Sequence, residues 1–501
     1  MKFSKVIITM VIICNYHSIQ GQELFNNRYI LDQTAVAFYD VFDFNDTLVS
    51  IGIGTTIYSP FPAKMIVTKF DRSGVRLMDD VILQDSFTNY NNRPNNASRF
   101  GRKIVVVGGG GGGLANRFGW YASYDLDIGL EWYREFEPIE NNQQIIYNSL
   151  LLENGHLLLL SADLLESDGY IITTVSEVNP EGEILWENSF GSGGVNHRPG
   201  RIVALSDSTY LIGLEKYPST GSGPNIHTFL IEIDNEGNVI STWDDQSTRT
   251  YAPRGMISLE DGGLIYASRY LTIPSTSSPT GFPSFQGYLV RQDSDQNVLW
   301  SLKTGSPNLR TDLFNMIKTS DGNYIAVGSN FDSIAVEGTW IRTGFLIKFD
   351  DEGTVIWEKQ YYGTFGGTHK NEFYDIVEMA DSSLVLCVVS TKSSEDFPQR
   401  GWLVSLDKNG NLDSLTVDVK MVETRSEVSL VLYPNPATDY VMVELSNENI
   451  ERVELYSMTG QLLRSEAVSG SRVEVSVGDL PSGVYSVLVN GRYGKRLVVG
   501  F

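Results

Sequence analysis

Two glycine-rich segments of the 501-residue sequence each end in a histidine, at His197 and His369, and Arg198 follows the first of them. A histidine beside an arginine is suited to acid–base chemistry or to anion binding. The whole chain has 5 histidines, which are too few to favour a metal centre. We therefore expect neither a metal ion nor another cofactor.

The segment from Asp293 to Asn297 is a second candidate for metal binding, because its spacing of acidic and amide residues resembles the beginning of a calcium loop. It lacks the glycine and the closing glutamate of an EF-hand, so a hairpin turn is favoured. The sequence contains no Gly-x-Ser-x-Gly, His-Glu-x-x-His or Cys-x-x-Cys motif. We therefore assign no catalytic residue from the sequence.

Aromatic side chains in the predicted loops offer flat faces on which a sugar or a peptide can pack. Together with the two histidines and the arginine they make up the predicted binding residues: Tyr361, Tyr362, Phe365, Trp340, Tyr217, His369, His197 and Arg198.

These residues lie between copies of a repeated sequence motif, and the fold of the repeats must position them. An apolar run ends in Asp-x-x-Gly, or a close variant, at seven places that lie 54 to 59 residues apart. The marker residues that open the phrase are Asp71, Asp125, Asn179, Asp234, Asp293, Asp350 and Asp407. Each repeat holds four short runs rich in β-branched and aromatic residues, which predicts strands. A four-stranded unit cannot cover both of its faces alone, so we predict an all-β fold in which the repeats close into a seven-bladed β-propeller.

Turn and packing residues recur with the same period. We expect positive φ at the glycine three residues after a marker, namely at Gly74, Gly182, Gly237, Gly353 and Gly410. We expect a tryptophan on the following strand to pack between blades, namely Trp132, Trp186, Trp243, Trp300 and Trp357. The repeats resemble a β-propeller repeat of secreted bacterial proteins. The best copies read Asp321-Gly-Asn-Tyr-Ile-Ala-Val-Gly328 and Phe345-Leu-Ile-Lys-Phe-Asp-Asp-Glu-Gly353.

Long connections between the second and third strands of a blade, and the links between blades, share one face of a propeller. The predicted long connections on this loop face are 55–63, 108–117, 216–227, 268–287, 330–344 and 391–400. Long loops on a rigid scaffold are where binding residues concentrate. We therefore predict that ligands bind at the loop face.

Residues 1–21 have the layout of a secretory signal peptide, and no later apolar run reaches the length of a membrane-spanning helix. The formal net charge of −23 argues against nucleic acid as a partner. Only 2 cysteines occur, and Cys387 lies in an apolar run where a buried position is expected.

After the propeller (22–415) we predict a linker (416–428) and a small Ig-like β-sandwich (429–501), since alternating strands resume there. This last segment resembles the type A C-terminal sorting domain of the type IX secretion system. The resemblance rests on motifs that contain Tyr433, Pro434, Asn435, Pro436, Gly460, Pro481, Gly483 and Tyr485. It implies that residues 429–501 engage the type IX machinery and direct the chain to the outside of the cell or to the outer-membrane surface.

From these features we expect a secreted or surface-displayed protein whose loop face binds a glycan, a protein or a surface polymer. One alternative is a hydrolase or lyase with an active site at the axial mouth of the propeller. Another is a structural surface protein without a discrete ligand.

Overall fold

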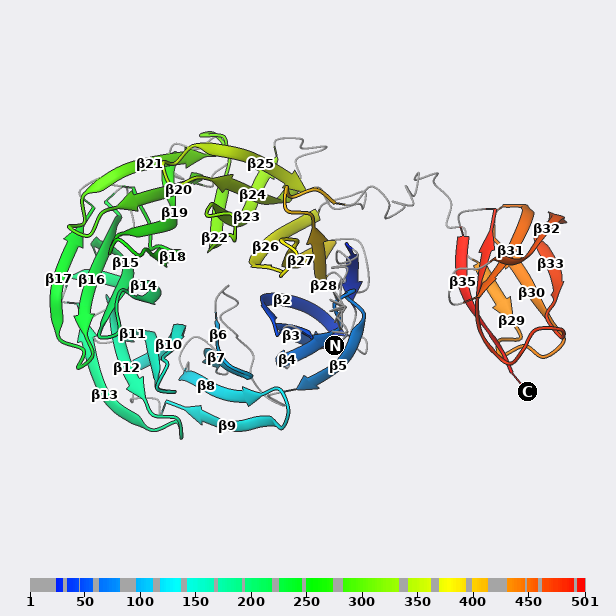
Figure 1. Cartoon of the computed structure of the whole chain (residues 1–501), viewed down its shortest axis with the longest axis horizontal. Helices are drawn as coiled ribbons and strands as arrows, with labels where there is room; N and C mark the ends of the chain where they lie inside the picture. The colour runs from blue at the N-terminus through cyan, green and yellow to red at the C-terminus, as the bar shows by residue number, and fades with distance from the viewer. Residues whose placement is uncertain are drawn as a thin grey trace, which may run out of the picture. The chain divides into compact units, whose positions relative to one another are not determined.

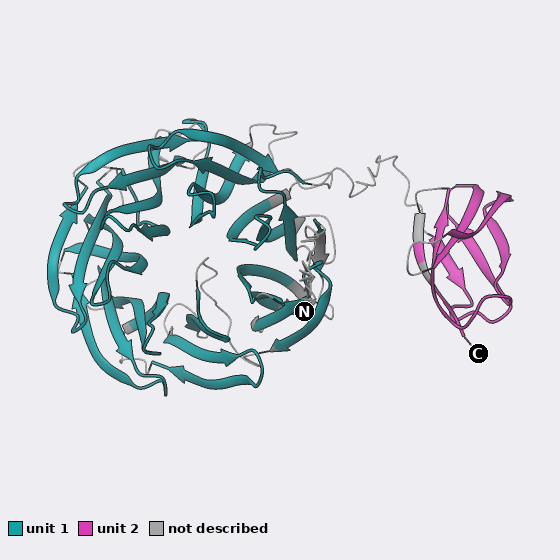
Figure 2. Ribbon diagram, viewed as in Figure 1, with its two compact units in different colours: residues 1–416 teal, residues 417–501 magenta. Residues whose placement is uncertain are grey.

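The computed structural model divides into two compact units, residues 1–416 and 417–501 (Figure 2). The structure describes residues 24–29, 34–44, 46–56, 63–81, 96–110, 118–136, 142–165, 170–191, 194–218, 225–245, 249–273, 283–332, 341–361, 369–392, 399–412, 430–446, 448–457, 462–490 and 493–500. Within these ranges the regular elements are all strands, which confirms the all-β prediction. No helix in the described ranges has the length and apolar character needed to cross a membrane. The predicted signal peptide and linker lie outside the described residues.

The strands of the first unit are β1 (Asn26–Tyr29), β2 (Thr34–Asp43), β3 (Leu48–Thr56), β4 (Ala63–Phe70), β5 (Arg76–Val81), β6 (Ala97–Phe100), β7 (Lys103–Gly110), β8 (Phe118–Asp125), β9 (Gly129–Glu135), β10 (Asn142–Leu151), β11 (Leu157–Leu165), β12 (Tyr170–Val178), β13 (Ile184–Phe190), β14 (Val195–Ala204), β15 (Thr209–Pro218), β16 (His227–Asp234), β17 (Val239–Asp244), β18 (Gly255–Ser258), β19 (Leu264–Ile273), β20 (Ser284–Gln292), β21 (Val298–Thr304), β22 (Thr311–Lys318), β23 (Tyr324–Asp332), β24 (Ile341–Phe349), β25 (Val355–Tyr361), β26 (His369–Glu378), β27 (Leu384–Lys392) and β28 (Gln399–Leu406).

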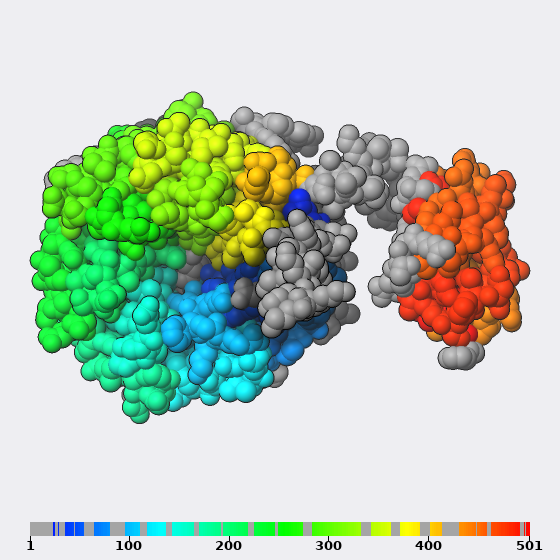
Figure 3. Space-filling view, viewed as in Figure 1, coloured from blue at the N-terminus to red at the C-terminus, as the bar shows by residue number. Residues whose placement is uncertain are grey.

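These strands form antiparallel sheets that follow one another around a common centre (Figure 1). Five sheets have four strands each: β2–β5, β6–β9, β10–β13, β14–β17 and β18–β21. An eight-stranded sheet contains β22–β25 and the set β26, β27, β28 and β1, and its two halves meet through the single parallel pair Arg342 and Lys370. The first strand of each four-stranded set lies nearest the centre (Figure 1). In the space-filling view, side chains occupy much of the space that the ribbons leave open (Figure 3).

The turn after the third strand of each set is held by the marker residue. In most repeats its side-chain oxygen accepts the backbone N–H groups two and four residues later; for Asp234 these are Glu236 at 2.9 Å and Asn238 at 2.8 Å. The predicted glycines have φ between 72° and 85°, which confirms the turn prediction. Asp293 makes the same contacts with Asp295 and Asn297, at 3.0 and 2.8 Å, so the segment that resembles a calcium loop is a hairpin turn.

The predicted tryptophans pack against the turn of the next sheet. Trp300 Nε1 donates a hydrogen bond to the Asp351 carbonyl at 2.7 Å, and a Cβ on Gly353 would lie 2.7 Å from the Trp300 ring. The rings of Trp132, Trp186 and Trp357 pack on Gly182, Gly237 and Gly410, where an added Cβ would lie 3.3, 2.6 and 3.0 Å from them. Trp243 packs with a cluster that contains residues of the β18–β21 sheet. The expectation of packing between sheets is therefore confirmed.

The N-terminal strand closes the ring. β1 pairs with β28, and the Ser405 N–H donates to the Phe25 carbonyl at 2.7 Å. The Phe25 ring lies against Gly74, in the turn of the first sheet, at the position where a tryptophan packs on Gly182, Gly237, Gly353 and Gly410. The Tyr29 hydroxyl donates to the Gly74 carbonyl, as the Tyr361 hydroxyl does to Gly410. The chain thus supplies the outer strand of its last sheet from its own beginning.

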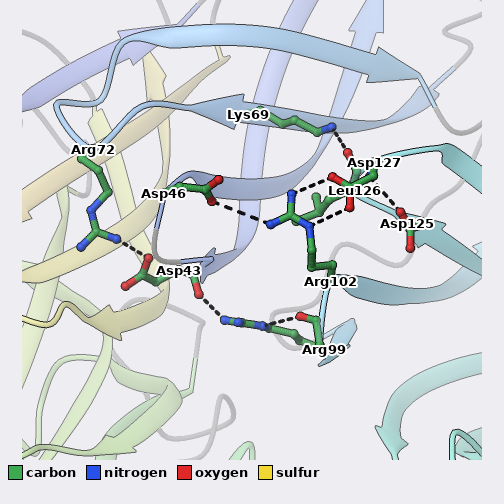
Figure 4. Close-up of polar contacts among 10 residues, drawn as sticks. Asp43, Asp46, Lys69, Arg72, Arg99, Arg102, Asp125, Leu126 and Asp127 are labelled. Carbon is green, nitrogen blue, oxygen red and sulfur yellow. Dashed lines mark hydrogen bonds and ion pairs between the residues drawn. The ribbon is translucent and has the colours of Figure 1, made fainter.

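Charged side chains join the first two sheets (Figure 4). The Arg102 guanidinium binds the Asp127 carboxylate through two hydrogen bonds of 2.8 and 2.9 Å, and Asp46 lies 3.9 Å away. Lys69 donates to the Leu126 carbonyl at 2.5 Å. The Arg102, Asp46 and Asp127 side chains lie at hairpin turns and are exposed, so their ion pairs are weak ties compared with the apolar contacts between sheets. The hydrogen bond from Lys69 is partly buried.

The second unit contains β29 (Leu430–Tyr433), β30 (Tyr440–Leu445), β31 (Ile450–Ser457), β32 (Leu462–Gly470), β33 (Arg472–Ser476), β34 (Gly483–Val489) and β35 (Tyr493–Val499). They form a sheet ordered β29-β30-β33 and a sheet ordered β32-β31-β34-β35. Inward-facing residues of both sheets, among them Val441, Val453, Val475 and Val487, make one apolar core. The unit therefore has a core of its own.

The glycine turns give a first test. Gly353 and Gly322 have φ of 79° and 85°, but only Gly353 faces a ring, since nothing lies within 4 Å of a Cβ on Gly322. Gly322→Ala should lose about 1 kcal/mol of unfolding free energy through its backbone conformation alone. Gly353→Ala should lose clearly more, because the Trp300 ring must move. Urea unfolding of both variants measures the difference, and equal losses would contradict the packing role.

The closing strand gives a second test. Phe25 is 6% exposed and Phe100 is 44% exposed. Phe25→Ala should lose about 3 kcal/mol or more of unfolding free energy, because it empties the seam between the last sheet and the first. Phe100→Ala is the matched control and should lose much less. A Phe25→Ala protein that unfolds like the control would contradict the packing role of Phe25 at this seam.

Candidate binding site

The innermost strands of several sheets are interrupted by a one-residue bulge near their middle. The bulged residues are Tyr39, Tyr147, Gly200, Phe314 and Tyr374. A bulge breaks the alternation of the strand and redirects the side chains next to it. The Tyr374 ring lies 5.0 Å from Tyr39 and 4.9 Å from Phe314, measured between ring centroids, so bulged aromatic residues from β2, β22 and β26 meet.

The residues after three of these bulges tie neighbouring sheets together. Asp375 accepts the Val41 N–H at 2.9 Å and the Asn315 side-chain amide at 2.5 Å. Asn148 accepts the Ile202 N–H at 3.0 Å. Burial raises the pKa of Asp375 and lowers that of Arg201, the corresponding residue of β14. A cavity of about 250 Å³ lies among these side chains.

A second cavity, of about 260 Å³, lies where the chain enters the innermost strands. We call it the axial pocket. Its charged lining consists of Arg198, Arg254, Arg269, Arg310, Arg342, Glu215, Asp312 and Glu372. Its aromatic lining consists of Tyr147, Tyr251, Phe314 and Tyr374. The links between sheets lead into the innermost strands, so this end of the strands is the side on which we predicted the loop face. The pocket lies at that end.

Ion pairs fix the orientation of the pocket arginines. The Arg198 guanidinium lies 2.6 Å from Glu215, and Arg310 lies 2.6 Å from Asp312. Arg269 is 3.3 Å from the second oxygen of Asp312, so this carboxylate bridges two arginines. Arg342 pairs with Glu372, which also accepts a hydrogen bond from the Tyr374 hydroxyl at 2.9 Å.

Electrostatics keep these groups ionised. Burial alone would raise the pKa of Asp312, but Arg310, Arg269 and Arg254 together hold it well below its usual range. Burial lowers the pKa of Arg198, yet the Glu215 carboxylate, together with Tyr147 and Tyr217, outweighs burial and raises it overall. Burial is also the main reason that the pKa values of Tyr251 and Tyr374 are raised, so both phenols are neutral at ordinary pH.

The pocket contains one of the predicted binding residues, Arg198. His197, beside it on β14, is buried and packs edge-on against Phe229 at 5.7 Å. Tyr217 is half-buried on β15 and does not line the pocket. Tyr361 is buried against Phe373, with its hydroxyl donating to Gly410, so it cannot stack on a ligand without unpacking.

The other predicted binding residues cannot be placed in the site. Tyr362, Phe365 and Trp340 lie outside the described residues. His369 begins β26, and its side chain is outside the described residues too. Within the described ranges no group of three or more histidine, cysteine or acidic side chains is arranged to hold a metal ion. Cys387 is buried and unpaired, as expected.

Sequence analysis did not identify the other pocket arginines. They come from different repeats: Arg254 precedes β18, Arg269 lies in β19, Arg310 precedes β22 and Arg342 lies in β24. No local motif links them. A detectable pattern was the aromatic residue followed by Asp or Asn in the first strand of a repeat, at Tyr39-Asp40, Tyr147-Asn148, Phe314-Asn315 and Tyr374-Asp375. This pattern marks the residues that turn toward the centre.

The motifs of the second unit make contacts that hold its two ends together. Asn435 accepts the Val498 N–H at 2.8 Å, and the Tyr485 hydroxyl donates to the Pro481 carbonyl at 2.5 Å. The Tyr433 hydroxyl donates to Glu444 at 2.9 Å. Residues 431–499 match the family model described as "Secretion system C-terminal sorting domain". The resemblance found in the sequence is thus confirmed, and a sorting domain implies that the chain is secreted.

Solved structures similar to the chain are distant. An ulvan lyase of a new polysaccharide lyase family has a TM-score of 0.46 and 10% identity, over 75% of this chain and 95% of that one. The β-propeller domain of the trilobed protease from Pyrococcus furiosus has a TM-score of 0.40 and 12% identity, over 74% and 95%. The Synechocystis apocarotenoid oxygenase has a TM-score of 0.44 and 10% identity, over 79% of this chain and 92% of that one. Likenesses at this level carry no information on activity. No curated protein matches the sequence.

Asp312 offers a test of the charged lining. Its side chain is 2% exposed, so Asp312→Asn leaves two arginines without their shared counter-charge. The variant should lose about 3–5 kcal/mol of unfolding free energy at pH 7. Because the folded pKa is depressed, the aspartate stabilises the fold fully above the usual aspartate pKa of about 3.9, and this stabilisation declines as the pH falls below it.

The difference in unfolding free energy between the unaltered protein and the Asp312→Asn variant should therefore become smaller toward pH 3. Asp127→Asn, at an exposed pair with Arg102, is the control and should change stability little. A gap that stayed constant from pH 7 to pH 3 would contradict the depressed pKa of Asp312.

Proposed function

We propose that this chain is a secreted binding protein whose binding site is the axial pocket of a seven-bladed β-propeller. The single observation that supports the proposal is the convergence of charged and aromatic side chains from separate sheets on one cavity. Concave pockets in which polar groups converge beside aromatic side chains are where small ligands bind, and in this pocket charged groups make up most of the lining.

The arrangement of the sheets supports a count of seven blades. We count the two halves of the eight-stranded sheet as separate blades, because only one residue pair joins them. With the five four-stranded sheets they make seven blades, which equals the number of marker residues. We assign residues 22–415 to the propeller, 416–428 to a linker and 429–501 to an Ig-like sorting domain.

The C-terminal match supports a route of export. We propose that residues 1–21 direct the chain to the periplasm and that the type IX machinery recognises residues 429–501 and carries the chain across the outer membrane. The protein then acts outside the cell or on the outer-membrane surface.

The charges in the pocket favour binding over acid–base catalysis. A hydrolase needs a carboxylic acid that can donate a proton and a second carboxylate that is free to act. Each carboxylate in the lining is instead paired with an arginine, and the pKa of Asp312 is depressed. The tyrosines have raised pKa values, which makes them poor bases. A site arranged in this way holds a ligand rather than exchanging protons with it.

A ligand screen tests the proposal. Residues 22–501 are presented to neutral and acidic glycans and to extracted surface polymers, and binding is measured by titration calorimetry. Tyr251→Ala removes an aromatic wall of the pocket and should weaken binding about tenfold or more. Tyr440→Ala is the control, because Tyr440 is 46% exposed in the second unit. Failure to bind any of these, or equal binding by both variants, would contradict the proposal.

A further inference from the structure

We propose that the axial pocket recognises an acidic sugar unit, one that carries a carboxylate or a sulfate group, within a polysaccharide. This inference rests on the proposed function and adds the chemical class of the ligand.

The charge of the lining is opposite to that of the molecule. Five arginines and three carboxylates line the pocket, which leaves an excess of two positive charges. The whole chain carries a formal charge of −23. A local positive site on an acidic protein attracts an anion to one place and repels extended polyanions elsewhere.

The carboxylates lie deeper than the arginines that they orient. Glu215 and Asp312 are 3% and 2% exposed, whereas their partners Arg198 and Arg310 are 27% and 31% exposed. Glu372 is 12% exposed, against 22% for Arg342. The guanidinium groups therefore form the accessible part of the lining, and the carboxylates hold them from behind.

The ion pairs do not satisfy all the donors of these arginines. Each guanidinium has five N–H groups, and the ion pairs use only some of them. The Nε atoms of Arg198, Arg269 and Arg342 are buried with no hydrogen-bond acceptor among the described residues. A carboxylate or sulfate offers the planar pairs of oxygens that guanidinium groups bind best.

Aromatic rings hold the arginines, and one of them is partly accessible to a sugar ring. The Arg269 guanidinium lies over Tyr251, 4.2 Å from the ring centroid, and that of Arg254 lies over Phe314, 5.2 Å from its centroid. Phe314 is 5% exposed, whereas Tyr251 is half-buried and can contact the C–H groups of a pyranose while the arginines hold its charged substituent. The volume of about 260 Å³ lies just below the range of about 300–1,000 Å³ for drug-sized ligands, so it fits one sugar unit better than a folded partner.

The test titrates residues 22–501 with four probes of matched length. They are oligogalacturonate, which carries carboxylates, a sulfated galactan oligosaccharide, a neutral dextran oligosaccharide and poly-glutamate. We expect binding of one or both acidic sugars, weaker binding at high salt, and no binding of dextran or poly-glutamate. The first two probes show whether carboxylate or sulfate is the preferred anion.

Variants connect the binding to the pocket. Arg254→Gln and Arg310→Gln should each weaken binding of the acidic sugar roughly tenfold. In the Arg310→Gln variant Asp312 still has Arg269 as a partner, so its carboxylate is not left unpaired. Arg310→Lys keeps the positive charge but not the planar guanidinium, so it should lose less affinity for the acidic sugar than Arg310→Gln. Arg102→Gln, an exposed arginine at the hairpin turns, is the matched control and should bind normally. Thermal unfolding establishes that each variant is folded.

The outcomes separate the two proposals. Binding of dextran that Tyr251→Ala abolishes and Arg310→Gln preserves would overturn the acidic sugar and leave the binding pocket in place. Binding of poly-glutamate as tight as that of the acidic sugars would overturn the choice of a glycan. Binding of acidic sugars that the arginine variants retain would place them outside the pocket and overturn the inference. If no probe and no ligand of the wider screen binds, both proposals fail.

Discussion

Each four-stranded sheet of the first unit has two apolar faces and can cover them only with its neighbours. The buried residues of β3 and β4, for example Val49 and Val67, belong to a core that also contains Ile104 and Trp120 of the next sheet. Burial of this kind contributes about 25 cal/mol for each Å² of apolar surface removed from water. A row of such sheets would leave its two end faces exposed, so the row must close on itself.

Closure of the ring requires the first and last strands of this unit to meet. The last sheet receives its outer strand from β1, and Phe25 takes the position that a tryptophan holds elsewhere. The two ends of the first unit are thereby fixed to one another. The same requirement brings the innermost strands together at the centre, where a buried Asp375 must find partners on β2 and β22. Buried polar groups without such partners would be costly.

The axial pocket is a consequence of this convergence. Arginines that are far apart in sequence meet where water is partly excluded, and their mutual repulsion is offset by carboxylates such as Glu215 and Asp312. Interactions between charges are stronger in such a site than on the surface. The exposed pair of Arg102 and Asp127 shows the contrast, since it is screened by solvent (Figure 4).

The sequence by itself determined the local structure. Marker residues such as Asp234, glycines such as Gly353 and alternating apolar runs specify strands and turns over a few residues, and local chemistry is sufficient for that. It also identified the sorting domain, whose motifs are contiguous. Only the tertiary structure decided which side chains share a pocket. Arg198 and Arg342 are 144 residues apart and meet because the ring closes. Tyr361 looked available in the sequence and is buried, because the next sheet covers it. Contacts of this kind depend on how sheets curve and pack, which no short stretch of sequence encodes.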